Sequence, residues 1–209
     1  MSFDIKEGVL VGYEGEDTEV VVPDGVQTIS DSAFAYSPVT SISIPGSVTK
    51  IERAAFSNTR QLKCIYLENY RCFLDEGLVW PSIIVDGVFT NNPPDIFING
   101  VLAEEIEIPD DVTEIGEFAF NGWKKLRSVV ISDNVKSIGK NAFTDCWNLK
   151  NIEIPNSIKE IKEYAFSNCT SLDSISIPDS VKLIERYAFQ GCNSLKTIEL
   201  PNKLKKIER

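Results

Sequence analysis

Residues 175–195 read Ile-Ser-Ile-Pro-Asp-Ser-Val-Lys-Leu-Ile-Glu-Arg-Tyr-Ala-Phe-Gln-Gly-Cys-Asn-Ser-Leu, and the spacing of the apolar residues in this stretch decides the fold. The same pattern recurs along the chain. Its Ala-Phe pair returns as Ala33-Phe34, Ala55-Phe56, Ala119-Phe120, Ala142-Phe143, Ala165-Phe166 and Ala188-Phe189, and the last four phenylalanines lie 23 residues apart. A fixed period of about 20 to 30 residues is typical of a solenoid, in which each repeat forms one coil.

Each coil is predicted to contain two apolar segments joined by a turn. The Leu-x-x-Ile-x-Ile segment alternates apolar and polar residues at its end, which predicts a short β-strand with inward aliphatics. Proline ends this strand because it cannot donate a hydrogen bond to the next strand. The following Val-x-x-Ile-x-x-x-Ala-Phe segment predicts a return along the other side, as a short strand and then a helical turn. One coil cannot bury its apolar face alone, so neighbouring coils must stack.

The pattern Ile-x-Ile-Pro-x-x-Val-x-x-Ile-x-x-x-Ala-Phe-x-x-Cys-x-x-Leu resembles the BspA-like leucine-rich repeat family of bacterial surface proteins. Residues 175–195 match it at every fixed position, and residues 18–67 and 104–209 match it closely. The resemblance implies an α/β solenoid of the leucine-rich-repeat type, a right-handed superhelix with short parallel strands and irregular or short helical returns. It also implies a cell-surface or secreted protein that acts in adhesion.

We expect residues 1–209 to form a single solenoid with one irregular region. Residues 1–17 resemble a cap, 18–67 and 106–209 hold regular coils, and 68–105 hold two degenerate coils with a loop between them. The irregularity shows in the distance from Phe56 to Phe120, which is 64 residues and not a multiple of 23. Simple drift of the repeat explains it, and a loop inserted for binding is the alternative.

Composition excludes several classes of function. The net charge is −10, which argues against a nucleic-acid partner because a phosphate backbone demands a basic surface. The chain has no histidine and no phosphate-binding or nucleophile motif, so we expect no enzyme, no metal site and no cofactor. No stretch approaches the ~20 apolar residues of a membrane span. The N-terminus lacks the features of a signal peptide, which leaves a cytoplasmic location or a trimmed signal as alternatives.

Outward residues of the predicted strands form a polar column, because column-mates in stacked coils lie roughly 4.8 Å apart. The candidate binding residues on this strand face are Glu107, Glu153, Ser176 and Glu199, with Val130 between the first two. An acidic and hydroxyl-rich face suits a basic protein or a glycan. A plain solvated strand face is the alternative.

A second column holds the candidate residues Lys136, Lys159, Lys182 and Lys205, each 23 residues from the next. Such a ladder suits a polyanion, for example a sulfated glycan. A face that keeps the protein soluble explains the lysines equally, because flexible ammonium groups in water repel one another only weakly.

Two further columns are apolar. Cys146, Cys169 and Cys192 share one column with Trp123, which predicts buried free thiols. A Cys64–Cys72 disulfide is an alternative for the remaining two cysteines. Phe118, Tyr164 and Tyr187 precede the alanines of their coils, and packing between adjacent rings or stacking on a sugar explains them.

The sequence therefore predicts a non-catalytic binding or adhesion module that recognises a protein or a glycan through its repeat face. A passive spacer or an intracellular interaction scaffold is the rival hypothesis. We expect a monomer, with end-to-end association through the apolar residues of the C-terminal coil as the alternative.

Overall fold

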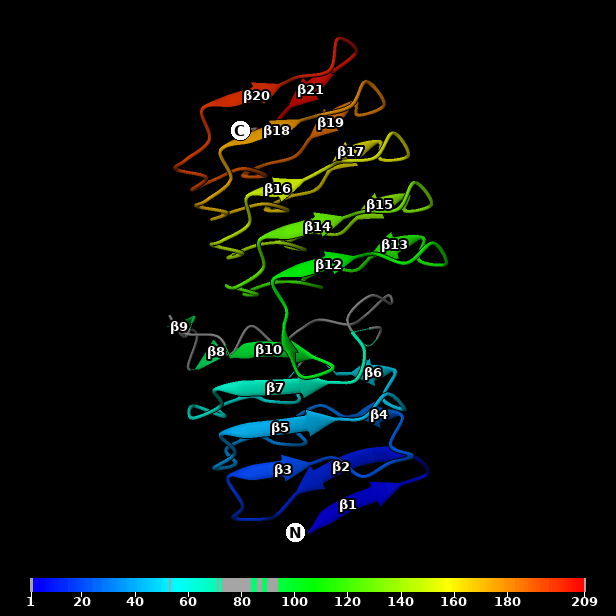
Figure 1. The fold of residues 1–209 in the computed structure, drawn as a ribbon, viewed down its shortest axis with the longest axis vertical. Coiled ribbons are helices and arrows are strands. Elements are labelled where there is room, and N and C mark those ends of the chain that lie inside the picture. Colours follow the sequence, from blue (N-terminus) through cyan, green and yellow to red (C-terminus); the bar gives the residue numbers. More distant parts are fainter. Residues whose placement is uncertain are drawn as a thin grey trace. The chain divides into compact units, whose positions relative to one another are not determined.

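The computed structural model describes residues 2–52, 54–70, 72, 84–85, 88–89 and 94–208. The chain divides into two compact units, Met1–Ala103 and Glu104–Arg209. Each unit is a β-solenoid in which strands of successive coils stack side by side (Figure 1). Within the described residues, none belongs to a helix of the length and apolarity that a membrane span requires.

The first strand column is formed by the Leu-x-x-Ile-x-Ile segments. In unit 1 it contains β3 (Glu19–Val21), β5 (Ser41–Ile44), β7 (Cys64–Leu67) and β10 (Asp95–Ile98), all parallel, with β11 (Val101–Leu102) antiparallel at the edge. In unit 2 it contains β12 (Glu105–Glu107), β14 (Ser128–Val130), β16 (Asn151–Ile152), β18 (Ser174–Ser176) and β20 (Thr197–Glu199). Each coil contributes one strand, and equivalent residues of successive coils pair with each other. Ile106 lies opposite Val129, and Val129 lies opposite Ile152. These three side chains are buried, as the alternation predicts.

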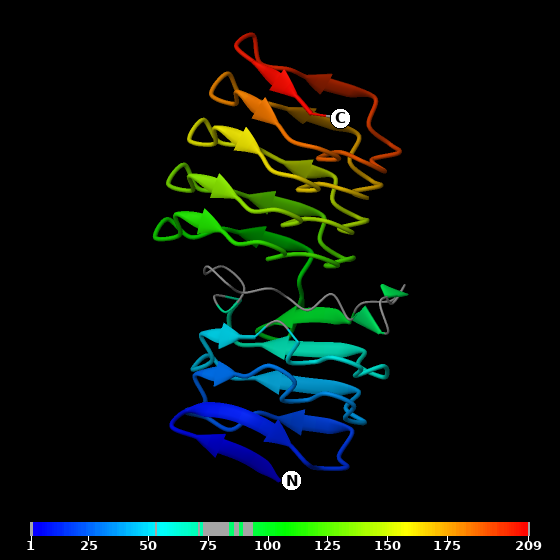
Figure 2. The same cartoon turned by 180° about the vertical axis from the view of Figure 1, so that it is seen from behind.

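The second strand column lies behind the first and is formed by the Val-x-x-Ile segments (Figure 2). Its members are β4 (Thr28–Ile29) and β6 (Lys50–Ile51) in unit 1, and β13 (Glu114–Ile115), β15 (Ser137–Ile138), β17 (Glu160–Ile161), β19 (Leu183–Ile184) and β21 (Lys206–Ile207) in unit 2. Neighbours pair in parallel, with Ile29 opposite Ile51 and Ile161 opposite Ile184. Every strand of the second column except the terminal β21 contributes one buried isoleucine, so the two columns enclose a core within each unit.

An antiparallel hairpin of β1 (Phe3–Lys6) and β2 (Val9–Tyr13) precedes the first coil, and β2 pairs in parallel with β4. Its two-residue turn, Glu7-Gly8, has positive φ at both positions, as a tight hairpin requires. The Tyr13 ring lies 5.4 Å from the Phe34 ring and so extends the core over the first coil. In the irregular region, β8 (Ile84–Val85) and β9 (Val88–Phe89) form another antiparallel pair.

The phenylalanines of the Ala-Phe pairs stack along the core. The rings of Phe120 and Phe143 have centroids 5.2 Å apart. Those of Phe143 and Phe166 have centroids 5.4 Å apart and are nearly parallel, with an interplanar angle of 2°. Each such pair adds about 0.5–1.5 kcal/mol beyond the burial of its area. The adjacent alanines, such as Ala142 and Ala165, are fully buried, so a larger residue there would separate the coils.

The predicted helical returns are wrong, because no α-helix occurs in the described part of the chain. The Ala-Phe segments contain left-handed residues on both sides of the pair, for example Asn141 (φ 57°) and Asp145 (φ 62°) around Ala142-Phe143. A left-handed residue interrupts a right-handed helix, so each segment forms turns instead. Its N–H groups bond to the next coil: Phe143 N donates to Ala165 O at 2.9 Å, and Phe166 N to Ala188 O at 2.9 Å.

All five cysteines are free thiols. Of the column predicted to be buried, Cys146 and Cys169 are fully buried and Cys192 is partly buried. The alternative of a disulfide between Cys64 and Cys72 is therefore wrong. The rings of Tyr164 and Tyr187 stack at 5.0 Å, which supports packing between adjacent coils as the explanation of these residues.

Candidate functional site

A groove crosses the first strand column of unit 2 and is the candidate binding site. Its cavity volume is about 520 Å³. Glu107 of β12, Val130 of β14 and Glu153, which directly follows β16, are the outward residues of three successive coils, and all three line it. The other lining residues are Ile108, Asp110, Ile131, Ser132, Asp133, Asn134, Ile154, Pro155 and Asn156. The structure thus places two of the four predicted acidic-face residues in one groove.

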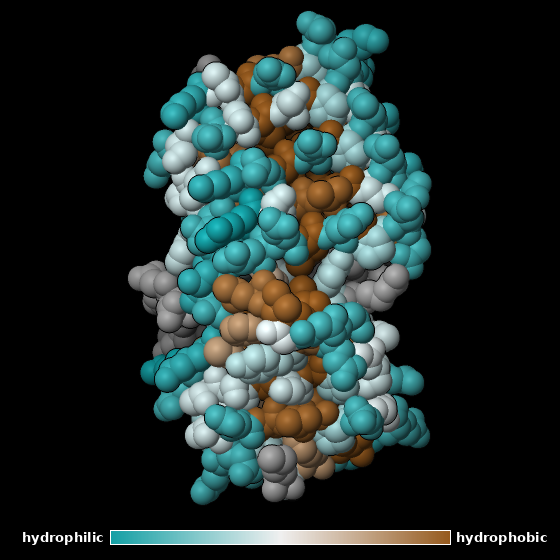
Figure 3. Space-filling view, in the orientation of Figure 1, coloured by the Kyte–Doolittle hydropathy of each residue, from teal (hydrophilic) through white to brown (hydrophobic). Residues whose placement is uncertain are grey.

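The groove combines one exposed apolar side chain with several acidic ones. Val130 is 57% exposed, whereas Ile131 and Ile154 are buried, at 7% each. Four carboxylates, from Glu107, Asp110, Asp133 and Glu153, line the same groove, and no lysine or arginine is among its described lining residues. Figure 3 shows hydrophobic surface between hydrophilic side chains on this face. Such a surface attracts positive charge and offers an apolar contact beside it.

The wall of the groove is shaped by one departure from the repeat. Ser132 stands where the other coils of unit 2 have proline, and its hydroxyl donates to Asp110 Oδ1 at 2.6 Å. Asn134 donates from its amide Nδ2 to the carbonyl of Asp110 at 2.8 Å, and from its backbone N to Ser132 Oγ at 3.2 Å. These bonds join the turns of two coils and hold the Asp110 carboxylate at the rim.

The other two predicted acidic-face residues lie one and two coils further along. The Ser176 hydroxyl donates to Glu199 Oε2 at 3.2 Å, across β18 and β20. Neither residue lines the groove. Within the described residues, no group of histidine, cysteine, aspartate and glutamate side chains is arranged to hold a metal ion.

The predicted lysine column follows the turns between the two strand columns and does not line the groove. Backbone hydrogen bonds join three of its lysines, since Lys182 N donates to Lys159 O at 2.8 Å and Lys205 N to Lys182 O at 2.9 Å. The ammonium of Lys136 donates to Asp133 O at 3.2 Å, and that of Lys182 donates to Asp179 O. These two lysines therefore bond the carbonyl of the turn three residues earlier.

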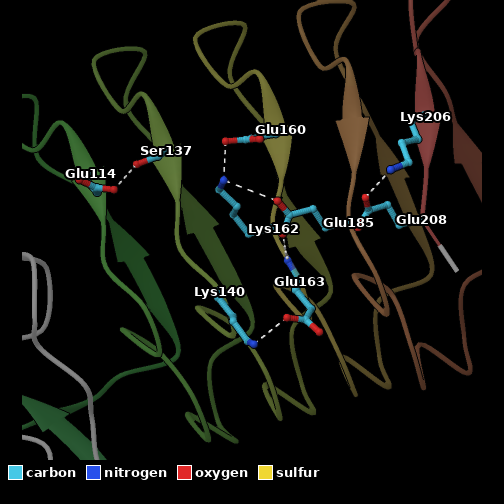
Figure 4. A network of polar contacts seen from close by, with 9 residues as sticks. All are labelled: Glu114, Ser137, Lys140, Glu160, Lys162, Glu163, Glu185, Lys206 and Glu208. Atoms are coloured by element: carbon cyan, nitrogen blue, oxygen red, sulfur yellow. Dashed lines mark hydrogen bonds and ion pairs between the residues drawn. The ribbon is translucent and has the colours of Figure 1, made fainter.

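The second strand column of unit 2 carries charges that neutralise one another (Figure 4). The ammonium of Lys162 lies 2.5 Å from a Glu160 oxygen and 3.6 Å from a Glu185 oxygen. The hydrogen bond to Glu160 is the main reason why the pKa of Lys162 is raised above its ordinary value. Lys140 bonds Glu163 at 2.6 Å, and this bond likewise raises the pKa of Lys140. The charged groups of this face are therefore paired with one another, within a coil and between coils.

Part of the site was missed by reasoning from the sequence. Asp110, Asp133 and Asn134 come from turns, where polar residues are ordinary and give no signal. The one available signal was Ser132, which interrupts the proline column of unit 2.

The sequence matches the family described as BspA type Leucine rich repeat region, in six copies over residues 13–75 and 91–209. A search of curated protein sequences gave no match.

Three solved structures of bacterial leucine-rich repeat proteins are similar to this chain. The protein from Eubacterium ventriosum is 24% identical, with a TM-score of 0.55 and coverage of 91% of this chain and 63% of that one. The protein from Bacteroides ovatus is 23% identical, with a TM-score of 0.53 and coverage of 99% and 53%. The protein from T. pallidum is 21% identical, with a TM-score of 0.54 and coverage of 93% and 87%. The chain thus spans less than two thirds of the length of the first two, and these likenesses concern the fold.

Proposed function

The chain belongs to the BspA-type leucine-rich repeat family, and from this premise we propose that it is a non-catalytic binding module that recognises a basic segment of a partner protein. The observation that carries the proposal is the groove of unit 2, which four carboxylates and an exposed valine line together. An apolar contact with a complementary charged rim is the usual composition of a protein interface.

The charge of the groove favours a protein over a glycan as the partner. A lysine or arginine segment would gain from Glu107 and Glu153 by charge complementarity, and its aliphatic stems would pack on Val130. The net charge of −10 adds a long-range attraction for basic partners. We propose a location at the cell surface or outside the cell, an expectation that rests on the family alone.

A passive spacer is the second candidate function. It is favoured by the second strand column, whose lysines and glutamates pair with one another from coil to coil and leave little charge for a ligand.

Binding of the immobilised full chain to a panel of matrix proteins, basic peptides, neutral glycans and polyanions at physiological salt tests the proposal. Three variants are run beside it: Glu107→Gln with Glu153→Gln in the groove, Glu16→Gln with Glu117→Gln as a matched loss of two exposed charges elsewhere, and Lys159→Gln with Lys182→Gln in the lysine column. We expect a basic protein or peptide to bind, and the groove variant to bind it about two- to tenfold more weakly.

Equal binding by the groove variant and the matched control would contradict the groove as the site. Loss confined to the lysine-column variant would move the site to a polyanion-binding face. Absence of binding across the whole panel would favour the spacer.

A further inference from the structure

The first strand column of unit 1 carries an exposed row that mixes aromatic and aliphatic side chains. Val21, Ser43, Tyr66 and Phe97 lie in register across β3, β5, β7 and β10. Tyr66 is 38% exposed and Val21 is 62% exposed. The row therefore presents two open apolar side chains with a small polar residue between them.

One face of the Tyr66 ring is covered and the other is open. The Phe97 ring stacks on it from β10, with centroids 4.9 Å apart and an interplanar angle of 23°. The opposite face is turned toward β5, where the row holds only Ser43. Strands lie about 4.8 Å apart, so roughly 10 Å separates the backbones that carry Tyr66 and Val21. That distance leaves room for one planar group in contact with both side chains, at about 3.5–4 Å from each.

A carboxylate stands beside this space. Glu19 lies on β3, two residues before Val21 and on the same side of the strand. Glu19 makes no ion pair with any residue that the structure describes. The pKa of Tyr66 is raised, first by its neighbour Cys64, then by burial and by a hydrogen bond with Cys64, and also by the negative charge of Glu19. The field of that carboxylate thus reaches the tyrosine.

We propose that this space, the Tyr66 slot formed by Glu19, Val21, Ser43 and Tyr66, receives an arginine side chain of a partner protein. A guanidinium is flat, carries a permanent positive charge and donates hydrogen bonds in its own plane. It can therefore stack on the open face of Tyr66 while its N–H groups bond to Glu19. Lysine lacks the flat surface, and a neutral sugar lacks the charge that Glu19 would compensate. This goes beyond the proposed function, because the slot lies in unit 1 and does not depend on the groove of unit 2.

The test uses the full chain labelled with 3-fluorotyrosine and followed by ¹⁹F NMR. The Tyr66 signal is identified as the one that disappears in Tyr66→Phe. The probe is the acetylated and amidated peptide Gly-Ser-Gly-Arg-Gly-Ser-Gly, and its control carries citrulline, which is flat but neutral, in place of arginine. We expect the arginine peptide to shift the Tyr66 signal saturably, and the citrulline peptide to bind about tenfold more weakly.

Three variants separate the slot from the groove. Glu19→Gln, an exposed substitution that leaves the core untouched, is expected to weaken arginine binding about threefold to tenfold. Tyr36→Leu removes another exposed tyrosine and is expected to have no effect, as is the groove variant Glu107→Gln with Glu153→Gln. Arginine binding that is lost in the groove variant and kept in Glu19→Gln would overturn the slot while supporting the groove.

Two other outcomes also overturn the slot. Equal shifts with the arginine and citrulline peptides would show that charge plays no part. A saturable shift caused by methyl glucoside or an N-acetylglucosamine oligomer, without one from the arginine peptide, would identify the slot as a sugar site instead.

Discussion

The thiol of Cys169 donates a hydrogen bond to the carbonyl oxygen of Phe143, one coil earlier, at an Sγ···O distance of 3.2 Å. Cys146 bonds Phe120 O and Cys192 bonds Phe166 O in the same way, both at 3.1 Å. Each of these carbonyls also accepts a backbone N–H of its own coil, so the thiol supplies a second hydrogen bond that links two coils.

These thiols make the fold sensitive to alkaline pH. Burial raises the pKa of Cys169 well above its ordinary value and that of Cys192 to about 11. In the unfolded chain a cysteine loses its proton near pH 8.5. The stabilisation is therefore complete below that pH and is lost as the pH rises toward the folded-state value, by up to about 1.4 kcal/mol per pH unit for each fully buried thiol. Urea unfolding of the wild type and of Cys169→Ala at pH 7, 9 and 10 checks this, because the variant should lose less stability between pH 7 and 10. Equal losses would contradict it.

Gly191→Ala is expected to destabilise the fold by about 1–2 kcal/mol. Gly191 has a φ of 73°, which an L-residue adopts only at that cost. A Cβ there would also meet Asn168 Oδ1 at 2.2 Å, so that side chain would have to move. Gly12→Ala is the matched control, since nothing lies within 4 Å of its added Cβ. Thermal or urea denaturation of both variants measures the difference, and a similar loss in each would disprove the argument.

Phe143→Leu is expected to cost roughly 1–3 kcal/mol, because Phe143 is fully buried between two stacked rings. Phe189→Leu should cost less, because Phe189 is only partly buried and stacks on the Phe166 ring, 5.5 Å away. Urea unfolding gives both values. A larger loss at Phe189 would show that the stack does not stabilise the core in this way.

The Lys140–Glu163 pair joins two coils at an N···O distance of 2.6 Å, with the lysine side chain 42% exposed. At this exposure a double-mutant cycle with Lys140→Gln and Glu163→Gln should give a coupling of about 0.3–1 kcal/mol. The coupling should shrink in 1 M NaCl, where charges are screened within about 3 Å. A coupling that did not change with salt would indicate that the pair acts by packing.

The inward columns were predictable from the sequence because burial forces one residue type onto each position of every coil. Phe120, Phe143 and Phe166 all occupy the same place for this reason. The helical turn predicted for the end of the Val-x-x-Ile-x-x-x-Ala-Phe segment does not form, because left-handed residues interrupt it. Its left-handed positions hold residues as different as Asn141 and Tyr164, so they give no common signal.

The candidate sites were only partly predictable. Glu107 and Glu153 follow from the period, whereas the groove depends on how Ser132 bonds to Asp110 across two turns. Tyr66 and Phe97 were missed for a different reason. Phe97 follows a region that breaks the 23-residue period, so the period could not show that its strand pairs with the strand of Tyr66.

The N–H groups that bond each Ala-Phe segment to the next coil have a mechanical consequence. Because these bonds join one coil to its neighbour, a pulling force on the ends of a unit would load the terminal coil first. That coil would unfold before the next coil came under force. Each released coil of 23 residues would lengthen the chain by roughly 75 Å, so the unit would extend in discrete steps and absorb work at each one.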